Sequence, residues 1–425
     1  MKNSNIQWIG EIPDDWEVDK IKFHLRRNEP RNPGNTEVLS VYREYGVIPK
    51  NSRDDNHNVT SEDTSKYKFV KTGDLVINKM KAWQGSLAVS DYEGIVSPAY
   101  FIYNFIDTVF HKKYFHYLIR NCYKEEFRRI STGIREGQWD LPANDFENTL
   151  VLLPPLATQT SIADYLDAKC SEIDGLIADI NKQIETLNEL KKSTITEAVT
   201  KGLNKNAKLK DSGIQWIGMI PEGWSVSRLK YVCSFKTGGT PSNKEGIFDE
   251  GLIPWITAQD MDQGLYLKTY TQFISAETVY KYKYKLFPKG SVLLVCIGST
   301  VGKNALALCN CYANQQITAL MPNDLVLDAF LLYSINAMKP NIVFYASSNV
   351  VPIINTQTIE NFSISLPPLT EQQSIATYLD SKCSEFDSII SDKQKQISTL
   401  EAYKKSLIYE YVTGKYAGAD QRVRP

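Results

Sequence analysis

Few residues in this chain are of the types and at the spacings that catalysis or metal binding requires. The 425 residues include four histidines and seven cysteines, and no histidine pair has the spacing of a zinc site. Cys309 and Cys311 have no second cysteine pair to complete a metal site. Segment 298–304 is close to a phosphate-binding loop, but it is one residue short between its glycines, and Asn304 follows the lysine in place of Ser or Thr. We therefore expect neither a metal site nor an ATP site.

Motifs of other enzyme classes are also missing from the sequence. It contains no G-x-G-x-x-G, no Asn-Pro-Pro-aromatic or Asp-Pro-Pro-aromatic tetrapeptide of the kind that holds the target base in amino-methyltransferases, and no nucleophile elbow. No set of residues supplies a nucleophile, a base and an oxyanion donor together. We expect a chain that contributes recognition and is not itself an enzyme.

Several loops interleave cationic, amide and aromatic residues in a way that suits DNA. Lys and Arg can pair with guanine edges, and Asn and Gln can pair with adenine edges. The net charge is only −1, but residues 111–139 hold seven Lys or Arg against three Glu, and residues 268–303 hold six Lys against one Glu. The predicted DNA-binding residues are Lys79, Lys81, Trp83, Gln84, Arg128, Arg129, Arg135, Gln138, Trp139, Lys236, Thr237, Gly239, Thr240, Ser242, Ser299, Lys303, Asn304, Asn314, Gln315, Gln316 and Asn349.

Two internal repeats divide the chain into tandem halves, roughly 1–206 and 207–425. A Trp-Ile-Gly-x-Ile-Pro-x-x-Trp motif within 4–22 recurs within 212–230, and a Leu-Pro-Pro-Leu junction at 153–156 recurs at 366–369. Self-similarity of this length indicates one structural unit used twice. The acids of the first motif do not have nuclease spacing, so we expect its apolar residues to dock into a core. These residues are Trp8, Ile9, Ile12 and Trp16.

Each junction is followed by about fifty residues of helical pattern without a proline. Apolar residues recur at alternating spacings of three and four, the pattern of a coiled-coil seam. Thr370 and Gln373 have the spacing of a capping box at the start of the second helix. The predicted seam residues are Ile173, Ile177, Ile180, Ile184, Leu187, Phe386, Ile390, Ile397, Leu400 and Leu407. Either the two copies pack on each other, or each packs on the core of its own domain.

Three lysines interrupt the seam, at positions 191, 393 and 404. A polar residue on a seam can fix the register of two helices. These lysines either do so here or mark where the seam meets helices of a partner protein.

The regions between these landmarks have the pattern of small mixed α/β domains. Short β-like runs are separated by Gly, Asn, Asp and Pro. The expected strands are 38–42, 74–78, 86–89, 99–103, 252–256, 291–297, 305–308 and 316–321, and the expected helices are 111–130, 276–284 and 326–338. The fold class is therefore α+β, with two globular regions and two long helices.

The composition points to the cytoplasm. The longest apolar run, 292–297, is far too short to cross a bilayer, and the first residues have no apolar signal region. An odd number of cysteines, two of them on the helix seams, suits a reducing compartment.

These features together resemble the specificity subunit of type I restriction-modification enzymes. The two tryptophan motifs and the two proline junctions are typical of that family, as are the glutamines that follow the junctions, Gln159 and Gln372. Segments 236–242 with 253–257, and 78–80 with 94–100, resemble two types of target recognition domain. One departure is Thr158, where the family usually has an acid before the glutamine, as Glu371 does here.

The resemblance implies a pseudo-twofold arrangement of two target recognition domains and two long antiparallel coiled-coil helices. The domains would be 1–155 and 207–368, the spacer helices 156–206 and 369–416, and 417–425 a flexible tail. Each recognition domain would read one half of a bipartite, asymmetric sequence in double-stranded DNA, and the helices would set the gap between the halves.

The resemblance also implies partners. Two methylation subunits would bring S-adenosylmethionine, and two restriction and translocation subunits would bring ATP and Mg, so that this chain binds no cofactor. Two alternatives stay open. One is a DNA methyltransferase or nuclease with unrecognised motifs, and the other is a coiled-coil assembly protein without sequence-specific DNA contact.

Overall fold

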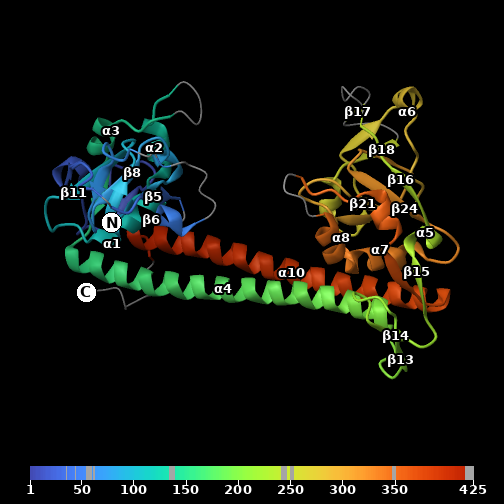
Figure 1. The fold of residues 1–425 in the computed structure, drawn as a ribbon. Coiled ribbons are helices and arrows are strands. Elements are labelled where there is room, and N and C mark those ends of the chain that lie inside the picture. Colours follow the sequence, from blue (N-terminus) through green and yellow to red (C-terminus); the bar gives the residue numbers. More distant parts are fainter. Residues whose placement is uncertain are drawn as a thin grey trace. The chain divides into compact units, whose positions relative to one another are not determined.

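The chain forms two compact units, each with its own globular domain. The computed structural model describes residues 1–34, 36–43, 45–53, 60, 63–133, 139–240, 247–248, 253–346 and 351–416. Unit 1 combines Met1–Ile180 with Gln394–Pro425, and unit 2 is Asn181–Lys393. Two long helices, α4 (Leu156–Lys201) and α10 (Leu369–Val412), are each divided between the units (Figure 1). The domain boundaries expected from the sequence stay a prediction, because these compact units cut through both helices.

The domain of unit 1 is built on a four-stranded antiparallel sheet in the order β4-β11-β8-β9. Its strands are β4 (Leu25–Arg27), β11 (Tyr100–Phe105), β8 (Leu75–Asn78) and β9 (Leu87–Val89). Four two-stranded pairs adjoin it: β5 (Leu39–Tyr42) with β6 (Gly46–Pro49), β7 (Lys68–Val70) with β10 (Gly94–Val96), β3 (Glu17–Lys20) with β12 (Leu150–Leu153), and β1 (Lys2–Asn3) with β2 (Glu11–Ile12). The helices are α1 (Lys112–Cys122), α2 (Lys124–Ile130) and α3 (Ala143–Asn148).

The domain of unit 2 has two larger sheets. The first has the order β16-β24-β21-β22-β19, and the second has the order β17-β20-β18-β23. Their strands are β16 (Cys233–Thr237), β24 (Ile317–Pro322), β21 (Val292–Val295), β22 (Asn304–Ala307), β19 (Tyr266–Leu267), β17 (Ile247–Phe248), β20 (Gln272–Ile274), β18 (Ile253–Ile256) and β23 (Tyr312–Ala313). Two further pairs are β13 (Leu209–Asp211) with β14 (Met219–Pro221), and β15 (Ser225–Arg228) with β25 (Ser363–Leu366). The helices are α5 (Leu229–Val232), α6 (Ala276–Tyr282), α7 (Asp328–Ala337), α8 (Lys339–Ala346) and α9 (Thr356–Glu360).

The expected strands are confirmed to within a few residues, and one expected helix is wrong. The segment 111–130 forms two helices, α1 and α2, because the backbone turns at Tyr123. The Tyr123 side chain is fully buried, and its ring meets the edge of Trp8 at a centroid distance of 4.8 Å. The turn allows the apolar faces of both short helices to reach one core, which a single straight helix could not do.

A hairpin with the same design lies in the centre of both domains. In unit 1 it is β8 and β9, and in unit 2 it is β21 and β22. The loop glycines Gly85 and Gly302 lie 217 positions apart, and both have positive φ, +90° and +87°. In each case the first lysine of a later short helix, α2 in unit 1 and α8 in unit 2, covers the glycine. A Cβ on Gly85 would lie 2.6 Å from Cε of Lys124, and a Cβ on Gly302 would lie 3.0 Å from Cγ of Lys339.

In unit 1 the first part of α4 packs along the last part of α10 in antiparallel orientation. Tyr165 stacks on Tyr411 at a centroid distance of 4.5 Å, and Asp174 forms an ion pair with Lys404 at 2.7 Å. Ile173 and Leu407 are buried in the core of this unit. Between Leu176 and Leu190 the positions off the predicted seam are exposed and the predicted seam positions are half-buried.

Unit 2 pairs the last part of α4 with the first part of α10, and it repeats the lysine–aspartate ion pair of unit 1. Lys191 forms an ion pair with Asp387 at 2.6 Å, and Lys393 donates to the side chain of Gln183. Lys191 and Lys404 are equivalent in the repeat, and so are Asp174 and Asp387, since both pairs are 213 positions apart. All three seam lysines therefore bond across the helix pair inside their own unit.

The predicted capping box at the start of α10 is wrong. Helix α10 begins at Leu369, so Thr370 lies inside the first turn, where its carbonyl accepts from Ser374. The carbonyl of Pro368 accepts the amide of Gln372, which places the helix start two residues earlier than a cap at Thr370 requires.

The tryptophan motifs dock into the cores, as predicted. Ile9, Ile12 and Trp16 are each 1% exposed or less, and Trp8 packs partly buried against the same core. Trp16 lies against Gly414, which ends α10, and Trp224 lies against Gly202, which ends α4. Both glycines have positive φ, the left-handed conformation that commonly ends a helix.

Candidate nucleic-acid interface

In unit 1 the structure brings two predicted DNA-binding segments together. Lys79, which follows β8, forms an ion pair with Asp140 at 2.7 Å. Trp83 and Trp139 lie 5.2 Å apart between ring centroids, and both are half-buried. Gln84 accepts a hydrogen bond from Arg43, which the sequence did not single out. The loop after β8 is thus held on two sides, and Lys81 on it is exposed.

Unit 2 holds a second group of predicted residues at one end of its larger sheet. The amide of Gly239 donates to the carbonyl of Ala313 at 3.1 Å, and the amide of Gln315 donates to Oγ1 of Thr240 at 3.2 Å. A Cβ on Gly239 would come within 2.7 Å of the ring of Tyr284, so only glycine fits this approach. The side chains of Asn314 and Gln316 bond to each other at 3.1 Å. A polar edge is therefore built from two loops that are distant in sequence.

Other candidates are already engaged within the protein. Arg129 pairs with Glu126 on α2 at 2.6 Å, and Lys303 forms an ion pair with Asp262. Lys236 donates to the carbonyl of Leu286 at 3.3 Å, and Thr237 bonds to Thr318 at 3.1 Å. Their roles in DNA binding stay predictions, and each would exchange an internal partner for one on DNA.

The remaining candidates divide into exposed, buried and undescribed residues. Arg128 on α2 and Ser299 in the loop between β21 and β22 are exposed. Asn304 is only 6% exposed, and its amide donates to the carbonyl of Leu332 at 3.1 Å and accepts from Asn336. Both ends of this amide are bonded to α7, so Asn304 is already engaged within the protein. Arg135, Gln138, Ser242 and Asn349 lie outside the described residues.

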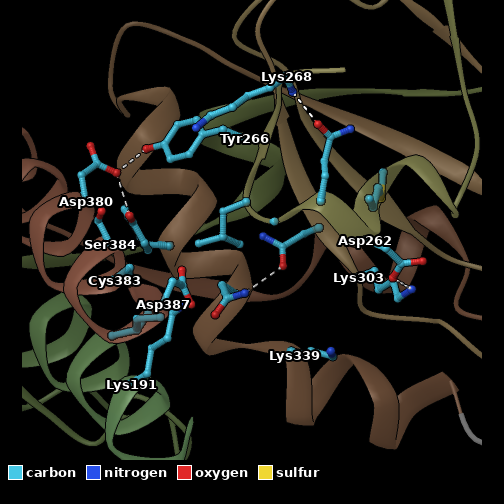
Figure 2. Close-up of a pocket in the computed structure, with 18 residues that line it drawn as sticks. Lys191, Asp262, Tyr266, Lys268, Lys303, Lys339, Asp380, Cys383, Ser384 and Asp387 are labelled. Atoms are coloured by element: carbon cyan, nitrogen blue, oxygen red, sulfur yellow. Dashed lines mark hydrogen bonds and ion pairs between the residues drawn. The ribbon is translucent and has the colours of Figure 1, made fainter. Parts of the chain in front are cut away.

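A cavity of about 900 Å³ opens in unit 2 where its domain meets its helices (Figure 2). Lys191 extends from α4 toward Asp387, and Lys303 lies beside Asp262 at the opposite side of the cavity. Lys268 and Lys339 also line it, Lys268 near the top of Figure 2 and Lys339 near the bottom. The charges are mixed, so the cavity surface offers both cations and carboxylates.

A carboxylate in the wall of this cavity accepts hydrogen bonds from two tyrosine hydroxyls. Tyr333 donates to Asp380 at 2.7 Å, and Tyr266 donates to the same oxygen. Burial raises the pKa of Tyr333 and also raises the pKa of the neighbouring Cys383 thiol. Both groups are therefore neutral at physiological pH, and the Tyr333 hydroxyl acts as a donor. In unit 1, Asp167 accepts from Tyr117 at 2.8 Å in the same way.

One buried glutamine fixes each long helix to its domain, a role that the sequence did not reveal. Gln159 accepts from the amide of His111 at 2.8 Å and donates to the carbonyls of Val109 and Pro154. Gln372 makes the same three bonds, to Leu327, Leu325 and Pro367. Both side chains are fully buried. The available signal was their identical place after the two Pro-Pro junctions.

The part of the chain that the structure describes has neither a metal-binding cluster nor a membrane-spanning helix. No group of three or more His, Cys, Asp or Glu side chains there could hold a metal ion. None of the helices described there combines the length and the apolar character needed to cross a membrane.

Comparisons with known proteins agree with this architecture. A family model described as the type I restriction modification DNA specificity domain matches residues 13–186 and 221–399. The putative type I restriction enzyme MjaX specificity subunit of Methanocaldococcus jannaschii is 27% identical over 96% of this chain and 95% of its own length. The EcoR124I/EcoR124II specificity subunit of Escherichia coli is 24% identical over 70% of each chain.

Solved structures share the fold. A chain from work on complex assembly and conformational transition of the type I R-M system has a TM-score of 0.73 at 19% identity, covering 95% of this chain and 98% of its own. The HsdS subunit from Thermoanaerobacter tengcongensis has a TM-score of 0.52 at 19% identity, covering 97% and 100%.

Proposed function

The chain belongs to the type I restriction modification DNA specificity family, and from this premise we propose that it directs such an enzyme to a bipartite, asymmetric DNA sequence. Each unit would read one half of the sequence through its own loops. The chain would supply recognition and no catalysis, and it would act in the cytoplasm.

The observation that carries this proposal is that one chain holds two family domains, one in each compact unit, with different loops on matched supports. The Trp, Gln and Gly residues that support the helices recur in both units. The loops do not: unit 1 offers Trp83 and Trp139, whereas unit 2 offers Thr240 and Gln315. Different base-facing groups on equivalent supports would give an asymmetric target.

We propose that α4 and α10 form an antiparallel coiled coil that sets the gap between the two half-sites. With 46 residues in α4 and about 1.5 Å of rise per residue, the helix is roughly 70 Å long. Half-sites separated by about one duplex turn, roughly 34 Å, are compatible with that length. The cross-helix ion pairs would hold the register of the two helices.

We propose that the exposed faces of the two helices dock two methylation subunits. Two repeated helices offer two similar surfaces, which suits two identical partners. S-adenosylmethionine would belong to those partners, while ATP and Mg would belong to two restriction and translocation subunits of the full enzyme.

The decisive experiment is to express the chain with its methylation subunits in a host that lacks them and to sequence the methylated genome. We expect a single bipartite adenine-methylated motif, which disappears when this chain is omitted. Methyl transfer by the isolated chain would show that it is an enzyme itself. Equal binding of target and random duplexes by the methylation complex would instead favour a non-specific assembly protein.

A further inference from the structure

Four cations of unit 1 gather at the edge of its central hairpin. We call Arg43, Arg120, Lys124 and Lys405 the cation cluster. Arg120 on α1 donates to the carbonyl of Arg43 at 2.6 Å, and Arg43 in turn donates to Gln84 in the hairpin loop. Lys124, the first residue of α2, lies over Gly85 in that loop. Lys405 comes from α10 and lies close enough for its charge to act on Lys124.

No carboxylate forms an ion pair with the cation cluster among the residues that the structure describes. This contrasts with Lys404, Lys191 and Lys303, which pair with Asp174, Asp387 and Asp262. Arg43, Lys124 and Lys405 are exposed, and Arg120 is half-buried. Holding four like charges together without an ion-pair partner is unfavourable, so the cluster has the electrostatics of a binding site for an anion.

The titration of the neighbouring groups agrees with this charge imbalance. Partial burial lowers the pKa of Lys124, and the charges of Arg120, Lys405 and Arg43 lower it further. Burial lowers the pKa of Arg120, and burial together with Arg120 lowers the pKa of His116 to about 4. His116 is therefore neutral and can accept from the guanidinium of Arg120, at 3.1 Å.

We propose that the cation cluster binds a backbone phosphate of the DNA. The location favours DNA over other anions, because Gln84 and Gly85 continue the loop that carries Lys81 and Trp83. A phosphate contact beside a base-reading loop fixes its position on the duplex without itself selecting sequence. This inference rests on the proposed function, and it adds residues that the sequence did not single out.

The test measures the dissociation constant for DNA as a function of salt. The complete chain, with its methylation subunits, is titrated with a duplex that carries the target and with one that lacks it. In the Lys124→Gln/Lys405→Gln variant, we expect the slope of log affinity against log salt to fall by about 0.9, the value for one phosphate contact. At about 0.15 M salt this corresponds to roughly fivefold weaker binding on both duplexes, with the preference for the target unchanged.

Lys192→Gln is the matched control. Lys192 is the repeat equivalent of Lys405, but it pairs with Glu189 on its own helix at 2.6 Å. We expect its slope to stay at the wild-type value. The melting temperature of the double variant without DNA should be equal to or higher than wild type, since like charges have been removed.

An unchanged slope in the double variant, with specific binding by the wild type, would overturn the phosphate site. Weaker association with the methylation subunits at unchanged DNA affinity would also overturn it and assign the cluster to a protein contact. If the wild-type complex itself shows no preference for any duplex, the proposed function fails, which is a different result.

Discussion

The two units share the same contacts between a hairpin glycine and a helix lysine, but the surfaces beside these contacts differ in charge. Gly85 and Gly302 occupy equivalent hairpin loops in the two units. Lys124 at the start of α2 covers Gly85, and Lys339 at the start of α8 covers Gly302. The charges that act on the pKa of Lys124 are those of Arg120, Lys405 and Arg43, whereas Lys339 shares its cavity with Asp262, Asp380 and Asp387. The repeat therefore preserves the contacts that hold helix and domain together, while the charge of the nearby surface differs between the two copies.

The largest expected effect concerns the tryptophans that close each core. Trp16→Ala and Trp224→Ala should each lower the free energy of unfolding of their own unit by about 3–5 kcal/mol, the usual cost of removing a large buried aromatic side chain. Calorimetry should resolve two transitions, with one shifted by each variant. If either variant lowers both transitions equally, the units do not unfold independently, and the comparison between them loses its basis.

The buried glutamines should give the next largest effect. Gln159→Ala and Gln372→Ala each remove three hydrogen bonds and leave a buried amide and two carbonyls without a partner. Each orphaned group costs about 1–3 kcal/mol before relaxation or water entry, so we expect roughly 2–4 kcal/mol in chemical denaturation. Gln373→Ala, one residue later and exposed, is the control and should be near neutral. A similar loss in the control would count against the specific role of Gln372.

Acid should weaken unit 1 through a group that unit 2 lacks. All four histidines precede residue 181, so none lies in unit 2. Because the pKa of His116 in the folded state is about 4, below its ordinary value near 6.5, the unfolded state binds the proton more tightly. Stability from this group is complete above pH 6.5 and is lost as pH falls toward 4, by about 2–3 kcal/mol.

His116→Gln should flatten this part of the pH profile for unit 1. The measurement is the melting temperature of each unit between pH 7 and pH 4. A profile for unit 1 that keeps its full slope in the variant would mean that carboxylates alone cause the acid sensitivity.

The two ion pairs between the long helices, Lys404–Asp174 and Lys191–Asp387, should contribute less to stability, because their aspartates are more than half exposed. For Lys404–Asp174 and for Lys191–Asp387, a double-mutant cycle should give a coupling of about 0.5–1 kcal/mol that declines with salt. Equal couplings would show that both units use the pair alike. Reversing both charges of one pair should restore most of the coupling, and failure to do so would exclude a simple charge pair.

The smallest effect is expected at Lys339. Lys339→Gln should reduce the salt slope of DNA binding by less than half of the change expected for the Lys124→Gln/Lys405→Gln variant, because carboxylates in the same cavity already offset its charge. Equal changes at both sites would mean that the charge difference between the units does not affect DNA contact.

The sequence was most informative where periodicity is set by burial. The 3-4 spacing predicted positions on α4 and α10 that are half-buried, and short apolar runs located the strands of both domains. It was less informative where a single side chain decides the local structure. Thr370 and Gln373 have a capping-box spacing, yet Pro368 starts the helix earlier, and Tyr123 divides a helical segment because its ring is needed in the core.

The candidate interface shows the same division. Loop composition pointed to Lys79, Trp83 and Thr240, and the structure then supplied their neighbours. Composition could not show that Asn304 is consumed by α7, or that Arg43 and Lys405 lie near Lys124. These are contacts between residues distant in sequence, and no local pattern encodes them.

The division of the long helices has a consequence for how the chain is made. Unit 2 is one continuous segment, whereas unit 1 needs residues 394–412, which are translated after the whole of unit 2. Until then Tyr114 has no Val412 carbonyl to bond, and Trp16 has no helix end to cover it. Unit 2 can therefore complete its folding during synthesis, while the older unit 1 stays open until the end. A chaperone that shields apolar surface would be needed longest by the domain that was translated first.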